Sequence, residues 1–229
     1  MKKAMTKTMT QALAVPTFTY SDDIDATHTM ALRKELKSHI KDLTLLPFFI
    51  KALSLSMKEF PIVNSVVDPE LDEEGYIKSY VVKHDHNFSV AIDSDHGLTT
   101  PNIKACNDKS ILQINSELRK MIERVSKNQL TQADFDDGTF SVSSVGNIGG
   151  KYFVPTILRP QAAIIAIGKA TKQPKYTGHH GAQHTWEPMD SISFSITADH
   201  RILDGATVAR FCQSFKRYIE HPNLMLISI

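Results

Sequence analysis

Cysteine is scarce in this chain, where Cys106 and Cys212 are the only two among 229 residues. They form neither a Cys-x-x-Cys pair nor a disulfide framework, which is typical of a protein from a reducing compartment. No stretch approaches the roughly 20 apolar residues of a membrane-spanning helix, so we expect no membrane partner. Basic and acidic residues nearly cancel, 26 against 25. Because no basic stripe with interleaved aromatic residues is present, we expect no nucleic-acid partner.

The chain does contain enough apolar residues for a core, 41% of the total. Its clearest helix is predicted over residues 108–127, where apolar side chains recur on one face. Alternating apolar and hydroxyl side chains predict a strand over residues 191–198. The order of elements is mixed, so we expect an α/β fold, a two-layer sandwich of mixed sheet and helices. The other predicted elements are a strand around residues 18–24, helices beginning at Thr27 and Pro47, strands at 76–83, 88–93 and 139–144, and a last long helix from Ala206.

The first chemical candidate is the run His-Arg-Ile-Leu-Asp-Gly at residues 200–205, which follows a predicted strand. An imidazole accepts and returns a proton near neutral pH, so His200 is a candidate general base. Asp204 adds a carboxylate just before a flexible glycine. The alternative interpretation is a structural histidine followed by an Asp-Gly pair that only caps the next helix.

The second candidate is the glycine-rich turn at residues 141–150. Hydroxyl side chains lead from a predicted strand directly into a loop where backbone can approach a ligand closely. The glycine spacing does not fit a dinucleotide or phosphate loop. A β-turn with ordinary serines remains the alternative.

Two further polar clusters are interpreted as loops. The acidic residues 68–75 are predicted to form a solvated loop between strands. The histidines His179, His180 and His184 fall in a predicted hairpin loop. Neither cluster has partners at metal-ligand spacing, so we predict no metal site.

Together these segments resemble one family, the dihydrolipoyl acyltransferase cores of the 2-oxoacid dehydrogenase complexes. Residues 198–205 (ADHRILDG) are similar to its active-site signature, and residues 138–146 (GTFSVSSVG) to its second signature. Further similarity covers nearly the whole chain, at residues 3–5, 16–18, 46–52, 60–64, 97–98 and 101–102. The surroundings at residues 22–25, 47–49 and 205–207 look most like the branched-chain member.

The resemblance implies a chloramphenicol acetyltransferase-like fold and a single acyltransferase catalytic domain over residues 1–229, without lipoyl or peripheral subunit-binding domains. It implies transfer of an acyl group, of the branched-chain type, between dihydrolipoamide and coenzyme A. Coenzyme A is then a substrate, and the lipoyl group is carried on a separate domain. The implied catalytic residues are His200 as general base, Ser143 as oxyanion donor and Asp204 as a supporting residue. The implied coenzyme A contacts are Arg33, Thr44, Asp93, Ser143, Ser144, Gly168 and Ala170.

The resemblance also implies partners and a location. We expect a homotrimer that assembles into a cubic cage, with its apolar tail at residues 223–229 docked into a neighbouring trimer. Further partners are the lipoyl domain and the dehydrogenase/decarboxylase and dihydrolipoamide dehydrogenase components of the complex. We expect no targeting segment in this chain. The compartment would be the mitochondrial matrix in a eukaryote and the cytoplasm in a bacterium.

Two points leave alternatives open. Met1, Met5, Met9 and Leu13 recur at helical spacing and predict a first helix. The family's usual partner of Asp204 is an arginine near this helix, whereas this chain has Lys2 and Lys3 there. A free-standing acetyltransferase of the chloramphenicol acetyltransferase type shares the His-x-x-x-Asp-Gly element but has a second histidine in place of Asp199. A non-catalytic scaffold core is the other alternative.

Overall fold

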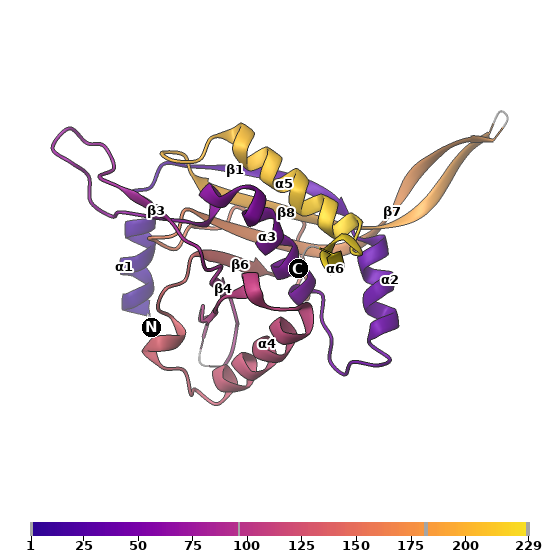
Figure 1. Ribbon diagram of the computed structural model, residues 1–229, viewed down its shortest axis with the longest axis horizontal. Coiled ribbons are helices and arrows are strands. Elements are labelled where there is room, and N and C mark those ends of the chain that lie inside the picture. The colour runs from indigo at the N-terminus through magenta and orange to yellow at the C-terminus, as the bar shows by residue number, and fades with distance from the viewer. Residues whose placement is uncertain (1, 96, 181–182, 228–229) are drawn as a thin grey trace.

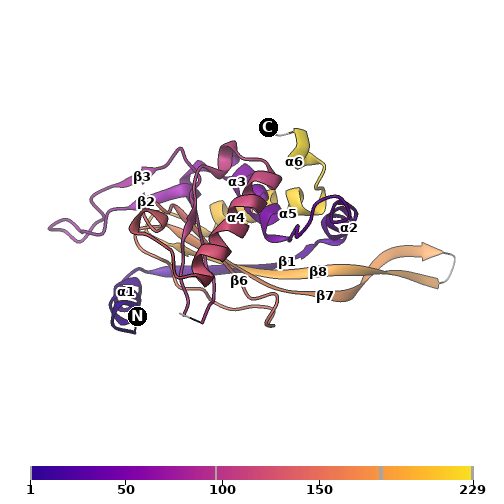
Figure 2. The same cartoon turned by 90° about the horizontal axis from the view of Figure 1, so that it is seen from below.

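A computed structural model describes residues 2–95, 97–180 and 183–227. One six-stranded mixed sheet runs through the molecule in the order β1-β8-β7-β6-β4-β5. Strand β6 is parallel to both β4 and β7, and the other neighbouring pairs are antiparallel. Helices α3, α4 and α5 cover one face of this sheet (Figures 1 and 2). The architecture is therefore the predicted α/β fold with one sheet layer and one helix layer.

The elements have the following bounds. The six-stranded sheet contains β1 (Thr17–Asp25), β4 (Phe88–Val90), β5 (Asn102–Ile103), β6 (Phe140–Ser144), β7 (Ala163–His180) and β8 (Gln183–Asp199). A small second sheet pairs β2 (Ser65–Val67) with β3 (Tyr80–Val82). The helices are α1 (Lys2–Ala12), α2 (Thr27–Leu36), α3 (Leu46–Glu59), α4 (Ile111–Ser126), α5 (Gly205–Glu220) and α6 (Leu224–Ile227). Single 3-10 turns are η1 (Pro61–Asn64), η2 (Cys106–Asp108) and η3 (Gln132–Asp134).

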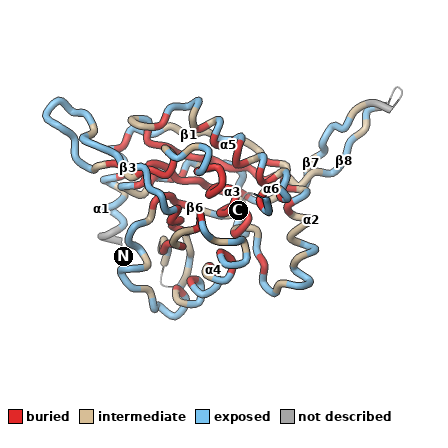
Figure 3. Tube along the Cα trace, in the orientation of Figure 1, coloured by how far each residue is buried: buried red, intermediate tan, exposed pale blue. Residues whose placement is uncertain are grey.

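The core lies between the sheet and the helices, where buried segments concentrate (Figure 3). The alternation in β8 directs Ile192, Phe194 and Ile196 into this core, and Phe194 meets Phe215 of α5 edge to face at 5.5 Å. The intervening residues of β8 carry hydroxyls on the opposite face, where Ser195 pairs with Ser21 of β1 at 2.8 Å. One face of the sheet is therefore apolar and the other is rich in hydroxyl groups.

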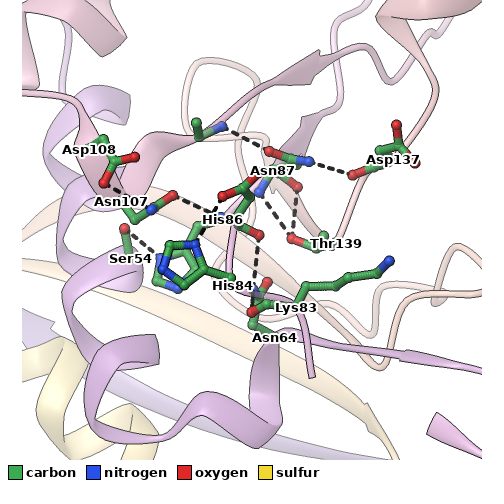
Figure 4. Close-up of polar contacts among 12 residues, drawn as sticks. Ser54, Asn64, Lys83, His84, His86, Asn87, Asn107, Asp108, Asp137 and Thr139 are labelled. Atoms are coloured by element: carbon green, nitrogen blue, oxygen red, sulfur yellow. Dashed lines mark hydrogen bonds and ion pairs between the residues drawn. The ribbon is translucent and has the colours of Figure 1, made fainter. Parts of the chain in front are cut away.

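Amide side chains fix the connection from β3 to β4 (Figure 4). Asn64 Nδ2 donates hydrogen bonds to the carbonyl oxygens of Lys83 and Asp85, at 2.8 and 3.0 Å. Asn107 Oδ1 accepts a hydrogen bond from the backbone N–H of His86 at 3.0 Å. These bonds satisfy backbone groups that no strand ladder pairs.

Several predicted boundaries are wrong by a few residues. The strand expected over residues 76–83 begins only at Tyr80, because Asp72 Oδ1 accepts the N–H groups of Glu74 and Tyr76 and holds the preceding chain in a turn. The strand expected over residues 88–93 ends at Val90, after which a single bridge continues the pairing. The helix predicted to begin at Thr27 does begin there.

The C-terminal tail has an internal partner, contrary to the expectation from sequence. Met225 is buried in the core, and Leu224 packs against it. Leu226 and Ile227 are exposed. The final two residues of the tail lie outside the described part of the chain.

Candidate active site

His200 lies immediately beyond the end of β8, with its side chain exposed. Its backbone N–H donates a hydrogen bond to the carbonyl oxygen of Pro16 at 2.9 Å. Its ring packs against Phe18 of β1, with centroids 4.5 Å apart and planes inclined by 49°. Among the residues that the structure describes, neither ring nitrogen has a hydrogen-bond partner. The imidazole is thus held in place while both nitrogens are available to a substrate.

The residues on either side of His200 form an ion pair with each other. Arg201 Nε and Nη2 donate to the two carboxylate oxygens of Asp199, at 2.9 and 2.6 Å, and the Arg201 backbone N–H adds a third bond at 3.0 Å. Asp199 is buried. These hydrogen bonds raise the pKa of Arg201 above its ordinary value. The side chains at 199 and 201 are therefore clamped together across His200.

Asp204 is the N-cap of α5. Its carboxylate accepts hydrogen bonds from the backbone N–H and the hydroxyl of Thr207, both at 2.8 Å. The hydrogen bond from the Thr207 backbone holds the pKa of Asp204 below its usual range. Among the described side chains no cation pairs with Asp204, and the side chains of Lys2 and Lys3 are not described. The capping interpretation of Asp204 is therefore correct as local structure.

Ser143 lies near the end of β6, paired with Ala166 of β7. Because Val142 points into the core, alternation directs Ser143 to the hydroxyl-rich face. Its side chain is half-buried and has no hydrogen-bond partner among the described residues. Ser144, the next residue, is exposed and pairs with Ile167.

His200 and Ser143 lie apart within one chain, His200 beyond the end of β8 and Ser143 on β6, two strands away. Ser143 is level with Ala166 of β7, which pairs with Ser195 of β8. Five further residues of β8 at roughly 3.3 Å each, and two strand spacings of about 4.8 Å, separate His200 from Ser143 by about 19 Å. A single chain does not bring these two side chains together.

Three of the residues implied as coenzyme A contacts, Gly168, Ala170 and Asp93, lie on or just beyond strands that pair with β6. Gly168 lies at an irregularity in the β7–β8 pairing, between Ile167 and Ala170. A Cβ on Gly168 would collide with the carbonyl oxygens of Lys151 and Gly150, so glycine allows the loop after β6 to cross β7 closely. Ala170 follows in the same strand. Asp93 is exposed beyond β4, beside Ile122 of α4 in a hollow of about 180 Å³.

Arg33 and Thr44 approach each other through the loop after α2. Arg33 Nε donates a hydrogen bond to the carbonyl oxygen of Leu43 at 3.0 Å. The next backbone N–H, that of Thr44, donates to Asn115 Oδ1 of α4 at 3.5 Å. Thr44 is exposed. The guanidinium of Arg33 retains its other N–H groups, which suit phosphate.

Other reactive side chains are unsuited to catalysis. Cys106 and Cys212 are buried free thiols. Burial raises the pKa of Cys106 to about 12 and also raises that of Cys212.

Among the described residues no group of three or more His, Cys, Asp or Glu side chains is arranged to hold a metal ion. None of the described helices has the length and apolar character needed to cross a bilayer.

The hairpin loop predicted over residues 177–183 is shorter than expected, because β7 continues to His180 and β8 begins at Gln183, so that His179 pairs with His184 in the ladder. The turn of this hairpin, and the side chains of His179 and His180, lie outside the described part of the chain.

The sequence interpretation missed Phe18 and Arg201 as neighbours of His200. The signal for Arg201 was present, since opposite charges at positions 199 and 201 flank the histidine.

Sequence comparison identifies the family. The 2-oxoacid dehydrogenases acyltransferase (catalytic domain) family matches residues 1–227, and the chain belongs to it. The lipoamide acyltransferase component of the branched-chain alpha-keto acid dehydrogenase complex of Caenorhabditis elegans, a mitochondrial protein, is 42% identical over 99% of this chain and 49% of its own length. The acetyltransferase component of the pyruvate dehydrogenase complex of Bacillus subtilis is 29% identical over 99% of this chain and 50% of its own. The chain spans about half the length of the curated relatives it matches.

Solved structures agree with this assignment. A dihydrolipoamide acetyltransferase of Azotobacter vinelandii, studied for the catalytic role of a serine, a histidine and an asparagine, superposes with a TM-score of 0.89 at 27% identity, covering 98% of this chain and 90% of its own. Its histidine and asparagine lie four residues apart, as do His200 and Asp204 here. The cubic core of a pyruvate dehydrogenase multienzyme complex gives a TM-score of 0.88 at 29% identity, covering 98% and 90%. Chloramphenicol acetyltransferase, at 13% identity and a TM-score of 0.58 over 93% and 94%, shares the fold.

Proposed function

We propose that this chain catalyses transfer of an acyl group between dihydrolipoamide and coenzyme A. The observation that carries the proposal is the exposed His200 imidazole in the run ADHRILDG. It is held at a strand end with both nitrogens available. Membership of the acyltransferase family supports the same chemistry.

In this reaction His200 acts on the thiol of coenzyme A. The imidazole accepts the thiol proton as the sulfur attacks the carbonyl carbon of the acyl-dihydrolipoamide thioester. A new carbon–sulfur bond forms to coenzyme A, and collapse of the adduct breaks the bond to the lipoyl sulfur. The imidazolium then returns the proton to the departing thiolate, so no net proton is consumed.

Ser143 stabilises the tetrahedral adduct. Its hydroxyl has no partner among the described residues and is therefore available to donate to the oxyanion. A positioned donor of this kind lowers the barrier by roughly 2.7 to 4 kcal/mol in other enzymes. Asp204 supports the site by capping α5 and so fixing the end of the His200 loop. Arg33, Thr44, Asp93, Ser144, Gly168 and Ala170 complete the coenzyme A channel in this proposal.

The active site in this proposal is shared between two copies of the chain. The separation of about 19 Å between His200 and Ser143 in one chain supports a site in which one copy supplies the base and the next supplies the oxyanion donor. A head-to-tail contact of this type closes into a ring, and a homotrimer is the ring we propose. The relative that forms a cubic core supports assembly of such trimers into a cage.

The acyl group we propose is branched-chain. The support is the higher identity to the branched-chain relative, 42%, than to the pyruvate relative, 29%. The proposed partners are a lipoyl domain and the dehydrogenase/decarboxylase and dihydrolipoamide dehydrogenase components. The proposed compartment is the mitochondrial matrix in a eukaryote and the cytoplasm in a bacterium.

An acyl-transfer assay tests the function. Acetyl-, succinyl- and isobutyryl-coenzyme A are offered in turn with dihydrolipoamide, and thioester formation is followed. We expect the largest kcat/KM with the isobutyryl donor and loss of turnover in His200→Ala. Absence of turnover with all three donors would favour the scaffold alternative. Acetyl transfer to a free hydroxyl acceptor in preference to dihydrolipoamide would favour the chloramphenicol acetyltransferase type.

A further inference from the structure

Among the described residues, no other residue forms a hydrogen bond with the ring of His200. In many enzymes a carboxylate or carbonyl on one imidazole nitrogen orients the other nitrogen. Here neither nitrogen has such a partner among the described residues, and the nearby carboxylates are occupied elsewhere. Asp204 binds Thr207, and Asp199 binds Arg201. Something other than a hydrogen-bonded carboxylate must keep this ring in place.

The backbone around His200 is fixed on both sides. The N–H of Asp199 donates to the carbonyl oxygen of Ala162 at 2.9 Å, and that of His200 donates to Pro16 at 2.9 Å. The carbonyl oxygen of Asp199 accepts the N–H of Leu203 at 3.0 Å, which turns the chain back toward α5. The Asp199–Arg201 ion pair also links the two side chains that flank His200. Both carboxylate oxygens of Asp199 accept hydrogen bonds from the Arg201 guanidinium.

The ring itself rests on Phe18. The two rings are 4.5 Å apart between centroids, and Phe18 is half-buried against the core, so its own position is set by packing. Phe18 therefore packs against the imidazole, and neither ring nitrogen hydrogen-bonds to another described residue. Loss of either support would let the imidazole rotate, and a displacement of about 1 Å can cost roughly a hundredfold in rate.

We propose that Phe18 and the Asp199–Arg201 ion pair are positioning residues that hold the His200 imidazole in the geometry for accepting a thiol proton. The inference rests on the proposed function and deepens it. Neither Phe18 nor Arg201 touches the reacting atoms in this account. Both act through His200.

The test compares Phe18→Leu and Arg201→Gln with a matched control, Arg124→Gln. Arg124 forms a two-bond pair with Asp134, at 2.6 Å for both bonds, between α4 and η3. The control therefore removes the same kind of ion pair away from His200. We expect kcat to fall at least about tenfold in Phe18→Leu and Arg201→Gln, with KM for coenzyme A within about twofold, and the control to keep its kcat.

A double-mutant comparison separates positioning from general damage. If Arg201 acts through His200, adding Arg201→Gln to His200→Ala should leave the residual rate unchanged within about twofold. A further loss as large as that caused by Arg201→Gln alone would overturn the proposal, as would a normal kcat in either single variant. If Arg201→Gln does not fold, Phe18→Leu, which keeps an apolar side chain, decides the question with its own double variant.

A measurement without turnover distinguishes failure of this inference from failure of the proposed function. The rate of His200 carbethoxylation by diethylpyrocarbonate is followed by peptide mass spectrometry, with His84, whose side chain is 90% exposed, as internal reference. We expect the rate at His200 to rise severalfold in Phe18→Leu, because a ring that no longer packs against Phe18 can rotate and present either nitrogen to the reagent. An unchanged rate would reject the positioning role, whether or not the wild-type protein transfers acyl groups.

Discussion

Ser54 Oγ of α3 lies 2.8 Å from Nδ1 of His86, and both side chains are buried (Figure 4). Burial lowers the pKa of His86 to about 4, and the charge of Lys58 acts in the same direction. His86 is therefore neutral at pH 7 and belongs to the structure rather than to catalysis. Its hydrogen bond ties the loop before β4 to the helix layer.

This depressed pKa predicts a loss of stability in acid. An unfolded chain protonates His86 below about pH 6.5, whereas the folded chain does so only near pH 4. The contribution to the free energy of unfolding is complete above pH 6.5 and is lost as the pH falls toward 4, by about 3 kcal/mol in total. Urea unfolding of wild type and His86→Gln between pH 7.5 and 4.5 measures it. Equal pH dependence in the two proteins would contradict this account.

Gly138 lies just before β6, and we predict that any side chain at this position would clash with its neighbours. A Cβ there would overlap Ser89 Oγ, Asn102 Oδ1 and Gln161 Nε2, which belong to one buried hydrogen-bond network. Gly138→Ala should lower the free energy of unfolding by about 1 to 3 kcal/mol. Gly205→Ala is the matched control, since its Cβ would meet open space, and should change stability by less than about 0.5 kcal/mol. Equal free energies of unfolding for the two variants would show that the network accommodates the added Cβ without loss of stability.

Two substitutions of Asp204 distinguish the role of its capping hydrogen bond from the role of its charge. Asn keeps an acceptor oxygen for the Thr207 N–H, whereas Ala removes it. We expect Asp204→Asn to retain both the Tm and most acyl transfer, and Asp204→Ala to lose Tm and kcat together. Thermal unfolding and steady-state kinetics on the same preparations test this. A stable but inactive Asp204→Asn would instead require an ion pair of Asp204 in the assembled protein.

We predict that substitution of Ser143 raises the free energy of the transition state rather than weakening substrate binding. Ser143→Ala should lower kcat about a hundredfold or more, because the lost hydroxyl stabilises the oxyanion of the transition state far more than it stabilises bound coenzyme A. KM should change by less than about twofold. Steady-state kinetics with both substrates varied provide the test. A raised KM with normal kcat would make Ser143 a binding residue.

The fold was predictable wherever one residue pattern determined the local structure. In α4 the apolar periodicity marked the helix, and Ser110 with Gln113 forms the capping box that starts it. The alternation in β8 identified its core face. The boundaries of β3 and β4 were not predictable from local propensity, since the turn at Asp72 precedes β3 and only a single bridge continues the pairing beyond Val90.

The sequence predicted which residues belong to the candidate site, but it did not predict how these residues are arranged in space. The motifs named His200 and Ser143, but their separation within one chain depends on the β6–β7 and β7–β8 pairings, which neither motif specifies. Phe18 was not identified as a neighbour of His200, because the register of β1 against β8 brings it there from 182 positions earlier in the sequence. The internal packing of Met225 likewise depends on tertiary contacts alone.

A complementation experiment tests the shared active site most directly. His200→Ala and Ser143→Ala are each inactive alone in this account, and equal amounts are refolded together. If each site takes His200 from one copy and Ser143 from the next, random mixing leaves about a quarter of the sites with both residues intact. The account predicts that the mixture recovers about a quarter of wild-type acyl transfer to dihydrolipoamide. Mixed oligomers confirmed by native mass spectrometry, with no activity above that of the parents, would contradict it.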